Sequence, residues 1–235
     1  MISILQWSAL AACIACTMWR FPAMLKGRNR TLFWVFLLMS TAVALSLPAI
    51  YLPIDGLLGG ANIANVILRL SLFGSFFLLA GKVAAAYNSQ SAYYLVRGPI
   101  GVAVLLGCSA GIWITYFIAD TQGSSTGLSG IPAQTSLTVY GWLGFLYMGY
   151  AAGCLIVPTA KAVFSPREFL DRAAAALMCL GFILVCVDVP LQISVIYVDA
   201  LVKVVSFSSI LCITSGLALV WVSYIRRRAQ QTVVA

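Results

Sequence analysis

Seven long apolar stretches, separated by short polar connectors, constrain the fold of this chain more than any other feature. The hydrocarbon core of a bilayer is about 30 Å thick, and a helix of about 20 apolar residues is long enough to cross it. The stretches lie at about residues 2–19, 32–52, 61–87, 98–119, 137–163, 169–189 and 195–224. The sequence therefore predicts an all-α integral membrane protein. It would be a seven-transmembrane-helix bundle, one domain over residues 1–228, with a short cytoplasmic tail at residues 229–235.

The composition supports a membrane protein and excludes several classes of function. Hydrophobic residues make up 62% of the chain and charged residues 9%, whereas a soluble domain is about half apolar and about a quarter charged. The lipid bilayer is therefore the expected surrounding of the bundle. The chain contains no histidine and its seven cysteines all fall in apolar stretches, so we expect no metal site, no cofactor and no enzymatic activity. No basic run with interleaved aromatic residues indicates a nucleic-acid partner.

The basic residues indicate which way the bundle faces. Of the 14 lysines and arginines, all but two fall in the connectors or span ends of one side. These are Arg20, Lys26, Arg28, Arg30, Lys82, Arg97, Lys161, Arg167, Arg172, Arg226, Arg227 and Arg228. The connectors of the other side contain only the acids Asp55 and Asp120. Because cytoplasmic connectors carry an excess of Lys and Arg, we expect a plasma (inner) membrane protein with its N-terminus outside and its C-terminus cytoplasmic.

The two remaining basic residues, Arg69 and Lys203, lie within predicted spans, as do the acids Asp188 and Asp199. Charges at membrane depth are costly and usually face protein or water. At about 1.5 Å per residue, Lys203 lies roughly 34 Å from Arg226 in the inner basic cluster. Asp199 lies one turn further out on the same face, so an ion pair between Asp199 and Lys203 is expected.

The same helical rise places the other two charges at a similar depth. Asp188 lies roughly 24 Å from Arg172, and Arg69 lies about two turns inside the third span. The four charges therefore share the outer third of the membrane. Three polar side chains lie at similar depth: Gln192, Asn62 and Asn65.

Two interpretations of this outer cluster stay open. It is either an outward-facing polar pocket that binds a ligand, or a structural ion-pair network that joins three helices. A second set of residues, Tyr140, Tyr147 and Tyr150, recurs on one face of the fifth span. These tyrosines either line a cavity or pack against neighbouring helices.

Two glycine pairs are candidate contact faces. Gly107 and Gly111, and Gly149 and Gly153, have the four-residue spacing that lets helices approach closely. We expect either a homo-oligomer through these faces or a protein partner at the cytoplasmic loops.

Three runs resemble a known family. They are R-N-R-T-L-F-W-V-F from Arg28, L-P-A-I-Y-L-P-I-D-G-L-L-G-G-A-N-I-A-N-V-I from Leu47, and T-V-Y-G-W-L-G-F-L-Y from Thr138. They are similar to the membrane domain of an uncharacterised actinobacterial family of multi-span proteins labelled as candidate transporters. The resembling positions include Pro48, Asp55, Gly60, Asn62, Ile63 and Ala64. The resemblance implies a cytoplasmic domain after the last span, whereas this sequence ends at Ala235. It supplies no catalytic residues.

The sequence favours a non-enzymatic sensor or regulatory module that binds a partner and has an outward-facing polar pocket. The alternative is a small-solute transporter or channel. A transporter requires a polar route to the inner side and often has broken helices in repeated halves. Few charges lie below the outer cluster and no such repeat is visible, so the sensor is preferred. No nucleophile–base arrangement indicates an intramembrane enzyme.

Overall fold

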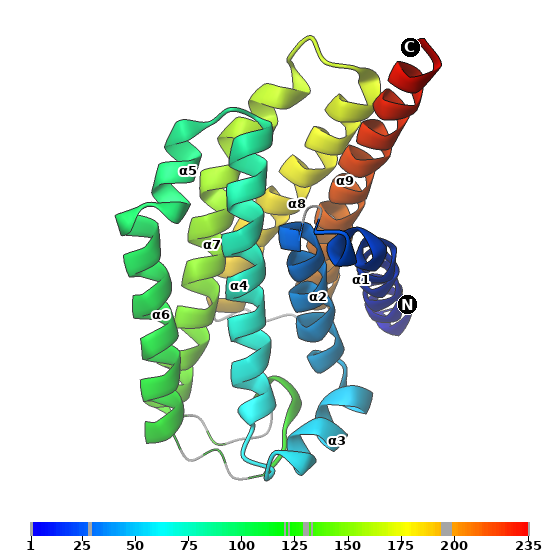
Figure 1. The fold of residues 1–235 in the computed structure, drawn as a ribbon. Helices are drawn as coiled ribbons and strands as arrows, with labels where there is room; N and C mark the ends of the chain where they lie inside the picture. Colours follow the sequence, from blue (N-terminus) through cyan, green and yellow to red (C-terminus); the bar gives the residue numbers. More distant parts are fainter. Residues whose placement is uncertain are drawn as a thin grey trace.

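The computed structural model describes residues 2–27, 30–119, 121, 123–128, 132, 134–193 and 199–234, with side chains as far as residue 227. These residues form a helical bundle, and no β-strand occurs within them (Figure 1). The helices are α1 (Ile2–Leu25), α2 (Arg30–Leu45), α3 (Pro48–Leu57), α4 (Ile63–Ala86), α5 (Gln90–Arg97), α6 (Pro99–Ile118), α7 (Thr135–Val163), α8 (Phe169–Ile193) and α9 (Asp199–Val234). A single 3-10 turn, η1, covers Thr126–Leu128.

Six of the helical segments are long and apolar enough to cross a membrane. They are α1, α4, α5 together with α6, α7, α8 and the part of α9 up to Arg227. The number rises to seven if α2 and α3, which are bent by 93° at their junction, form one broken span. The predicted apolar helical bundle is therefore confirmed, and the predicted count of seven depends on this bent pair.

The junction of α2 and α3 differs from the continuous span predicted at residues 32–52. Helix α2 ends at Leu45, and Leu47 is in an extended conformation with φ −91° and ψ 121°. A residue before proline avoids the helical region, and proline suits the first turn of the next helix. Pro48 therefore both ends the first helix and starts α3 in a new direction.

Two other predicted boundaries are corrected. Residues 88–97 were expected to form a connector, but α5 occupies most of this segment, with the Ser89 hydroxyl accepting from the Ala92 amide at its N-terminus. The sixth span was expected to end at about residue 189, but α8 continues through Pro190 to Ile193. A proline removes only one helical hydrogen bond, which neighbouring groups can replace in a membrane helix.

Some sequence predictions fall on residues that the structure does not describe. The start of the seventh span at Val195, the acid Asp120 and the base Arg28 lie outside the described residues. Helix α9 begins at Asp199 and its backbone continues over most of the predicted tail at 229–235.

Six helices pack side by side in a closed ring. Helix α1 packs against α2 and α9, α2 against α4, α4 against α7, α7 against α8, and α8 against α9. Helices α5 and α6 lie outside this ring, against α4 and α7 (Figure 1). Aromatic side chains fill the centre: the rings of Phe73 and Tyr147 lie 4.6 Å apart, and those of Phe76 and Phe182 lie 6.4 Å apart. These contacts fix α4, α7 and α8 to one another.

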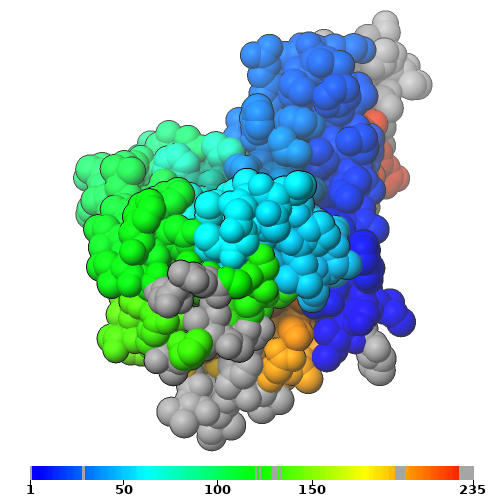
Figure 2. Space-filling model, turned by 90° about the horizontal axis from the view of Figure 1, so that it is seen from below, coloured from blue at the N-terminus to red at the C-terminus, as the bar shows by residue number. Residues whose placement is uncertain are grey.

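The bundle has two different ends. We call the end that carries α3 and residues 123–128 the α3 end, and the end that carries α5 and the turn between α7 and α8 the α5 end (Figure 1). Figure 2 views the α3 end, where α3, in cyan, lies across the surface between α1 and α2 on one side and α6 on the other.

Candidate functional site

A buried polar corner joins α3 to α4 at the α3 end. The Asp55 carboxylate accepts hydrogen bonds from the backbone N–H groups of Asn62 (3.0 Å) and Ala64 (3.1 Å) and from the hydroxyl of Ser124 (2.7 Å). Asp55 and Asn62 are fully buried. A carboxylate near the first amides of a helix satisfies donors that have no partner within that helix. Asp55 therefore acts as the cap of α4.

The Asn62 side chain extends this corner to the segment after α6. Its amide nitrogen donates to the carbonyl oxygens of Thr121 (2.9 Å) and Gly123 (2.8 Å). Its oxygen accepts from the Tyr51 hydroxyl (2.9 Å) and the Ser125 amide (2.8 Å). The backbone of Asn62 is left-handed, with φ 61°, a conformation that asparagine tolerates better than most residues. Asn62 thus joins α3, α4 and the segment after α6 in one structural corner.

Arg69 lies in a second polar cluster, between α4 and α7. Its Nε donates to Asn65 Oδ1 (3.2 Å) and its terminal nitrogen donates to the Gly141 carbonyl (3.2 Å). The guanidinium stacks over the Tyr140 ring at 4.4 Å, and the Tyr140 hydroxyl donates to Asn65 Oδ1 at 2.8 Å. In the part of the chain that the structure describes, no carboxylate contacts this cation. Neutral acceptors and an aromatic face hold it.

The position of Arg69 depends on a missing side chain. A Cβ atom added at Gly144 would lie 1.6 Å from the terminal nitrogen of Arg69. Gly144 is buried and lies one helical turn from Tyr140 on α7. The absence of a side chain at Gly144 therefore leaves the space that the guanidinium fills on the side of α7 that packs against α4.

Asp188 belongs to a third group, between α8 and α9. Its Oδ2 accepts from the Ser206 hydroxyl (2.9 Å) and from the Gln192 amide (3.5 Å). Its other oxygen is buried and has no hydrogen-bond partner among the described residues. Asp199 and Lys203 form the expected i,i+4 ion pair, with 2.7 Å between charged atoms, on an exposed part of α9.

The structure therefore distributes the predicted outer cluster over separate local groups. Arg69 joins Asn65 and Tyr140, Asp188 joins Gln192, and Asp199 joins Lys203. No described contact links one of these groups to another. Helix α4 packs against α2 and α7, whereas α8 packs against α7 and α9. Residue counting gave these charges a similar depth, but the structure places them on different pairs of helices.

The three tyrosines of α7 also have different surroundings. Tyr140 belongs to the Arg69 cluster. Tyr147 is fully buried against Phe73, and its hydroxyl has no hydrogen-bond partner among the described residues. The Tyr150 hydroxyl donates to the Leu95 carbonyl, and Tyr150 lines a cavity at the α5 end.

The glycine pairs serve packing within the chain. A Cβ atom at Gly111 would lie 2.6 Å from Leu143 on α7, and one at Gly149 would lie 2.9 Å from Val189 on α8. A Cβ atom at Gly153 would lie 4.0 Å from Cys186, and one at Gly107 would meet no atom within 4 Å. Three of the four glycines therefore lie against helices of the same chain.

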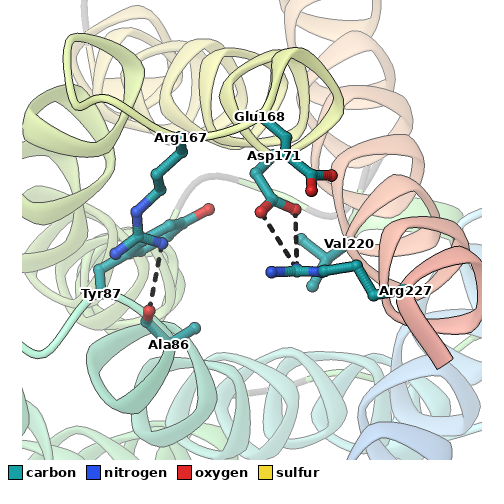
Figure 3. A pocket seen from close by; sticks show the side chains of 7 residues that line it. All are labelled: Ala86, Tyr87, Arg167, Glu168, Asp171, Val220 and Arg227. Atoms are coloured by element: carbon teal, nitrogen blue, oxygen red, sulfur yellow. Dashed lines mark hydrogen bonds and ion pairs between the residues drawn. The ribbon is translucent and has the colours of Figure 1, made fainter. Parts of the chain in front are cut away.

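Two neighbouring cavities open at the α5 end. The smaller, of about 310 Å³, lies between the end of α4, the start of α8 and the end of α9 (Figure 3). Asp171 and Arg227 form an ion pair on one side of it, with 3.1 Å between charged atoms. On its other side, Arg167 donates to the Ala86 carbonyl at 3.3 Å and stacks over the Tyr87 ring at 5.0 Å. Burial raises the pKa of the Tyr87 phenol to about 12.

The larger cavity, of about 770 Å³, lies between α5 and α7. It shares two lining residues, Tyr87 and Arg167, with the smaller cavity. Its size is in the range of small-molecule sites in proteins. The remaining lining residues are Asn88, Ser89, Gln90, Ser91, Ala92, Leu95, Gly149, Tyr150, Gly153, Cys154, Val157, Pro158, Lys161, Ala162 and Ser165.

The sequence predicted a site at the α3 end and did not predict that the residues lining the larger cavity come together. Two polar runs were the available signal: N-S-Q-S from Asn88 and S-P-R-E from Ser165. Both were treated as connectors or helix starts. The pairing of the two runs depends on how α4 packs against α7, which hydropathy does not reveal.

Comparison of the chain with protein-family models, with curated proteins and with solved structures finds no match. The functional argument therefore depends on the geometry of the bundle and its cavities.

Proposed function

We propose that this protein is a non-enzymatic, multi-pass plasma-membrane module that binds a ligand at its α5 end and regulates a partner protein there. One observation carries the proposal: Arg167 and Tyr87 form the shared wall of the two cavities. The larger cavity has room for a ligand, and the smaller one is formed by the ends of three helices. The ligand site of this proposal is at the α5 end, in place of the outer pocket that the sequence favoured.

The shared wall supports a regulatory mechanism. The Arg167 guanidinium is held by a carbonyl oxygen and an aromatic ring, which are weaker partners than an anion. An anionic ligand in the larger cavity attracts this guanidinium away from the Ala86 carbonyl. The smaller cavity then loses the wall that lies opposite the Asp171–Arg227 ion pair. The ligand thereby shifts the population of two arrangements of the α8 and α9 ends.

The distribution of charge supports a cytoplasmic position for this surface. Lys161, Arg167, Arg172 and Arg227 lie at the α5 end, and the positive-inside rule places such an end in the cytoplasm. The N-terminus is then outside and the C-terminus cytoplasmic. The resemblance to the actinobacterial family is a proposal of common descent and assigns no activity.

Cysteine labelling tests the orientation. Phe164, 85% exposed at the α5 end, and Leu57, 89% exposed at the α3 end, are each replaced by cysteine. We expect a membrane-impermeant maleimide to label Leu57→Cys in intact cells and Phe164→Cys only after permeabilisation. The parent chain, with its seven native cysteines, is the control. The reverse labelling pattern contradicts the orientation.

Site-specific photo-cross-linking tests the regulatory role. A photoreactive amino acid replaces Gln90, which lines the larger cavity, or Leu57 as the matched exposed position at the other end. We expect a discrete protein adduct from position 90 that weakens with Arg167→Gln, and none from position 57. An adduct from position 90 that is indifferent to Arg167, or no adduct from that position, contradicts the proposal.

A second candidate, a small-solute transporter, is favoured by two charges within the bundle. Arg69 has no described carboxylate partner, and one oxygen of Asp188 is buried without a hydrogen bond. Ionisable groups of this kind often mark a substrate route. Flux assays in proteoliposomes decide between the candidates. Solute flux that is lost in both Asp188→Asn and Arg69→Gln supports transport, whereas flux equal to that of empty liposomes supports the regulatory module.

A further inference from the structure

The larger cavity at the α5 end changes in polarity along its length. Near the end of the bundle it is lined by the polar start of α5, at Ser89 to Ser91, and by the basic residues Lys161 and Arg167. Deeper in the bundle it is lined by apolar residues of α5 and α7, including Leu95 and Val157. Such a gradient matches an amphiphile, with a polar head at the membrane surface and an apolar tail in the bilayer.

The polar part of the cavity is suited to a negative charge. Two basic side chains line it, and no acid is among its described lining residues. The N-terminus of α5 also lies here, where the first amide groups have no acceptor within their own helix. The Ser89 hydroxyl accepts from the Ala92 amide at 3.4 Å and lies 3.3 Å from the Ser91 hydroxyl, which leaves the earlier amides of the helix as donors. Charge and donors together favour a phosphate group.

The apolar part of the cavity is suited to an acyl chain. Its deeper lining comes from Leu95 on α5 and from Gly149, Gly153 and Val157 on α7. The twelve-residue separation of Gly149 and Lys161 corresponds to roughly 18 Å along the helix, close to the length of an extended acyl chain. Val157 is 57% exposed and Gly153 is also exposed, so this part of the cavity is open along its side.

We propose that the larger cavity binds an anionic phospholipid, with its phosphate between Lys161, Arg167 and the start of α5 and one acyl chain along α7. Basic pockets between transmembrane helices on the cytoplasmic side commonly bind anionic headgroups. The inference rests on the proposed function, because it names the ligand of the same site. Phosphate binding engages Arg167 directly, so the lipid composition of the membrane is the signal that this site reads.

Native mass spectrometry of the purified protein tests the site. Phosphatidylglycerol and phosphatidylcholine with identical acyl chains are the two probes. We expect the protein to retain phosphatidylglycerol preferentially. The Lys161→Gln/Arg167→Gln double variant loses that preference and binds phosphatidylglycerol about thirtyfold more weakly, because each basic residue near an anionic membrane contributes a factor of about five.

A matched double variant controls for charge and folding. Lys26→Gln/Arg172→Gln removes the same charge from exposed positions that do not line the cavity. It should bind phosphatidylglycerol like the parent, and both double variants should keep the parent's helical circular dichroism. Equal retention of the two lipids, or equal losses in the two variants, overturns the proposal.

Competition separates a lipid from a soluble anion. Glycerol 3-phosphate and inorganic phosphate carry the charge without the acyl chains, and we expect neither to displace phosphatidylglycerol. Displacement by either one overturns the lipid assignment in favour of a soluble phosphate ligand. The cross-linking result is independent of lipid binding. An Arg167-dependent adduct without a preference for phosphatidylglycerol contradicts only the lipid proposal. A preference for phosphatidylglycerol without an adduct contradicts only the proposed regulation of a partner protein.

Discussion

The Asp55 carboxylate lies 3.0 Å from the backbone nitrogen of Asn62, at the corner where α3 meets α4. The same carboxylate accepts from the Ala64 amide and the Ser124 hydroxyl. One buried charge thus starts a membrane helix, sets the direction of the short helix before it and holds the segment after α6. A carboxylate that satisfies several buried donors contributes more to stability than a surface charge.

Removing this carboxylate should destabilise the whole α3 end. Asp55→Ala leaves two buried amides and a hydroxyl without their acceptor, and we expect a loss of about 3 kcal/mol in unfolding free energy. The matched control is Asp199→Ala, whose ion pair with Lys203 is exposed and should contribute less than about 1 kcal/mol. Unfolding in mixed detergent micelles measures both. Similar losses in the two variants would contradict the assignment of Asp55 as the cap of α4.

The space beside Gly144 gives a second prediction. Gly144→Ala forces the Arg69 guanidinium off the Tyr140 ring, because the added Cβ atom would lie 1.6 Å from it. We expect a loss of about 1–3 kcal/mol in unfolding free energy. At Gly141, on the same helix, an added Cβ atom meets nothing within 4 Å, so Gly141→Ala should change stability by less than about 1 kcal/mol. Shortening Arg69 to alanine should suppress the effect of Gly144→Ala, and additive losses would argue against the contact.

The Asp171–Arg227 ion pair beside the smaller cavity should respond to a charge exchange. Asp171→Arg and Arg227→Asp each place like charges together, and each should lower the unfolding free energy by about 1 kcal/mol. The double exchange restores an opposite pair and should recover most of the loss. High salt should reduce all of these differences, since Arg227 is half exposed. If the loss in unfolding free energy of the double variant equals the sum of the two single losses, the pair does not join α8 to α9.

The contact between α1 and α9 gives a fourth prediction. Arg20 is 3% exposed and its guanidinium lies 3.8 Å above the Trp221 ring, while one of its terminal nitrogens has no hydrogen-bond partner among the described residues. The stacking is therefore its main stabilising contact. Trp221→Leu should cost about 2 kcal/mol, whereas Trp142→Leu, at a half-exposed tryptophan, should cost less than about 1 kcal/mol. In an Arg20→Met background, the cost of Trp221→Leu should fall markedly.

Hydropathy was sufficient to predict the helices but not their arrangement. Long apolar runs such as residues 63–86 have one stable form in a bilayer, because every backbone group must be paired within the helix. The bend at Pro48 also has a clear local signal, since the residue before proline avoids the helical region. The direction of α3 after the bend depends on Asp55 reaching Asn62, a contact that a hydropathy pattern does not contain.

The outer charge cluster shows why a shared depth was insufficient. Residue counting gave the depth of Arg69 and Asp188 along their helix axes. It gave neither the rotation of each helix nor its neighbours. Arg69 faces α7 through the gap left at Gly144, and Asp188 faces Ser206 on α9. The i,i+4 pair of Asp199 and Lys203 was predicted correctly because both residues lie on one helix.

The short second helix has a consequence for the bilayer around this protein. Helix α2 has 16 residues and corresponds to roughly 24 Å, whereas the 24 residues of α4 correspond to roughly 36 Å. Helix α3 turns aside by 93° and adds little to the height of α2, and Leu57 on α3 is almost fully exposed. The apolar surface is therefore shorter along the helix axis beside α2 than beside α4. Where α2 and α3 form one broken span, hydrophobic mismatch favours a bilayer that is thinner beside α2 than beside α4.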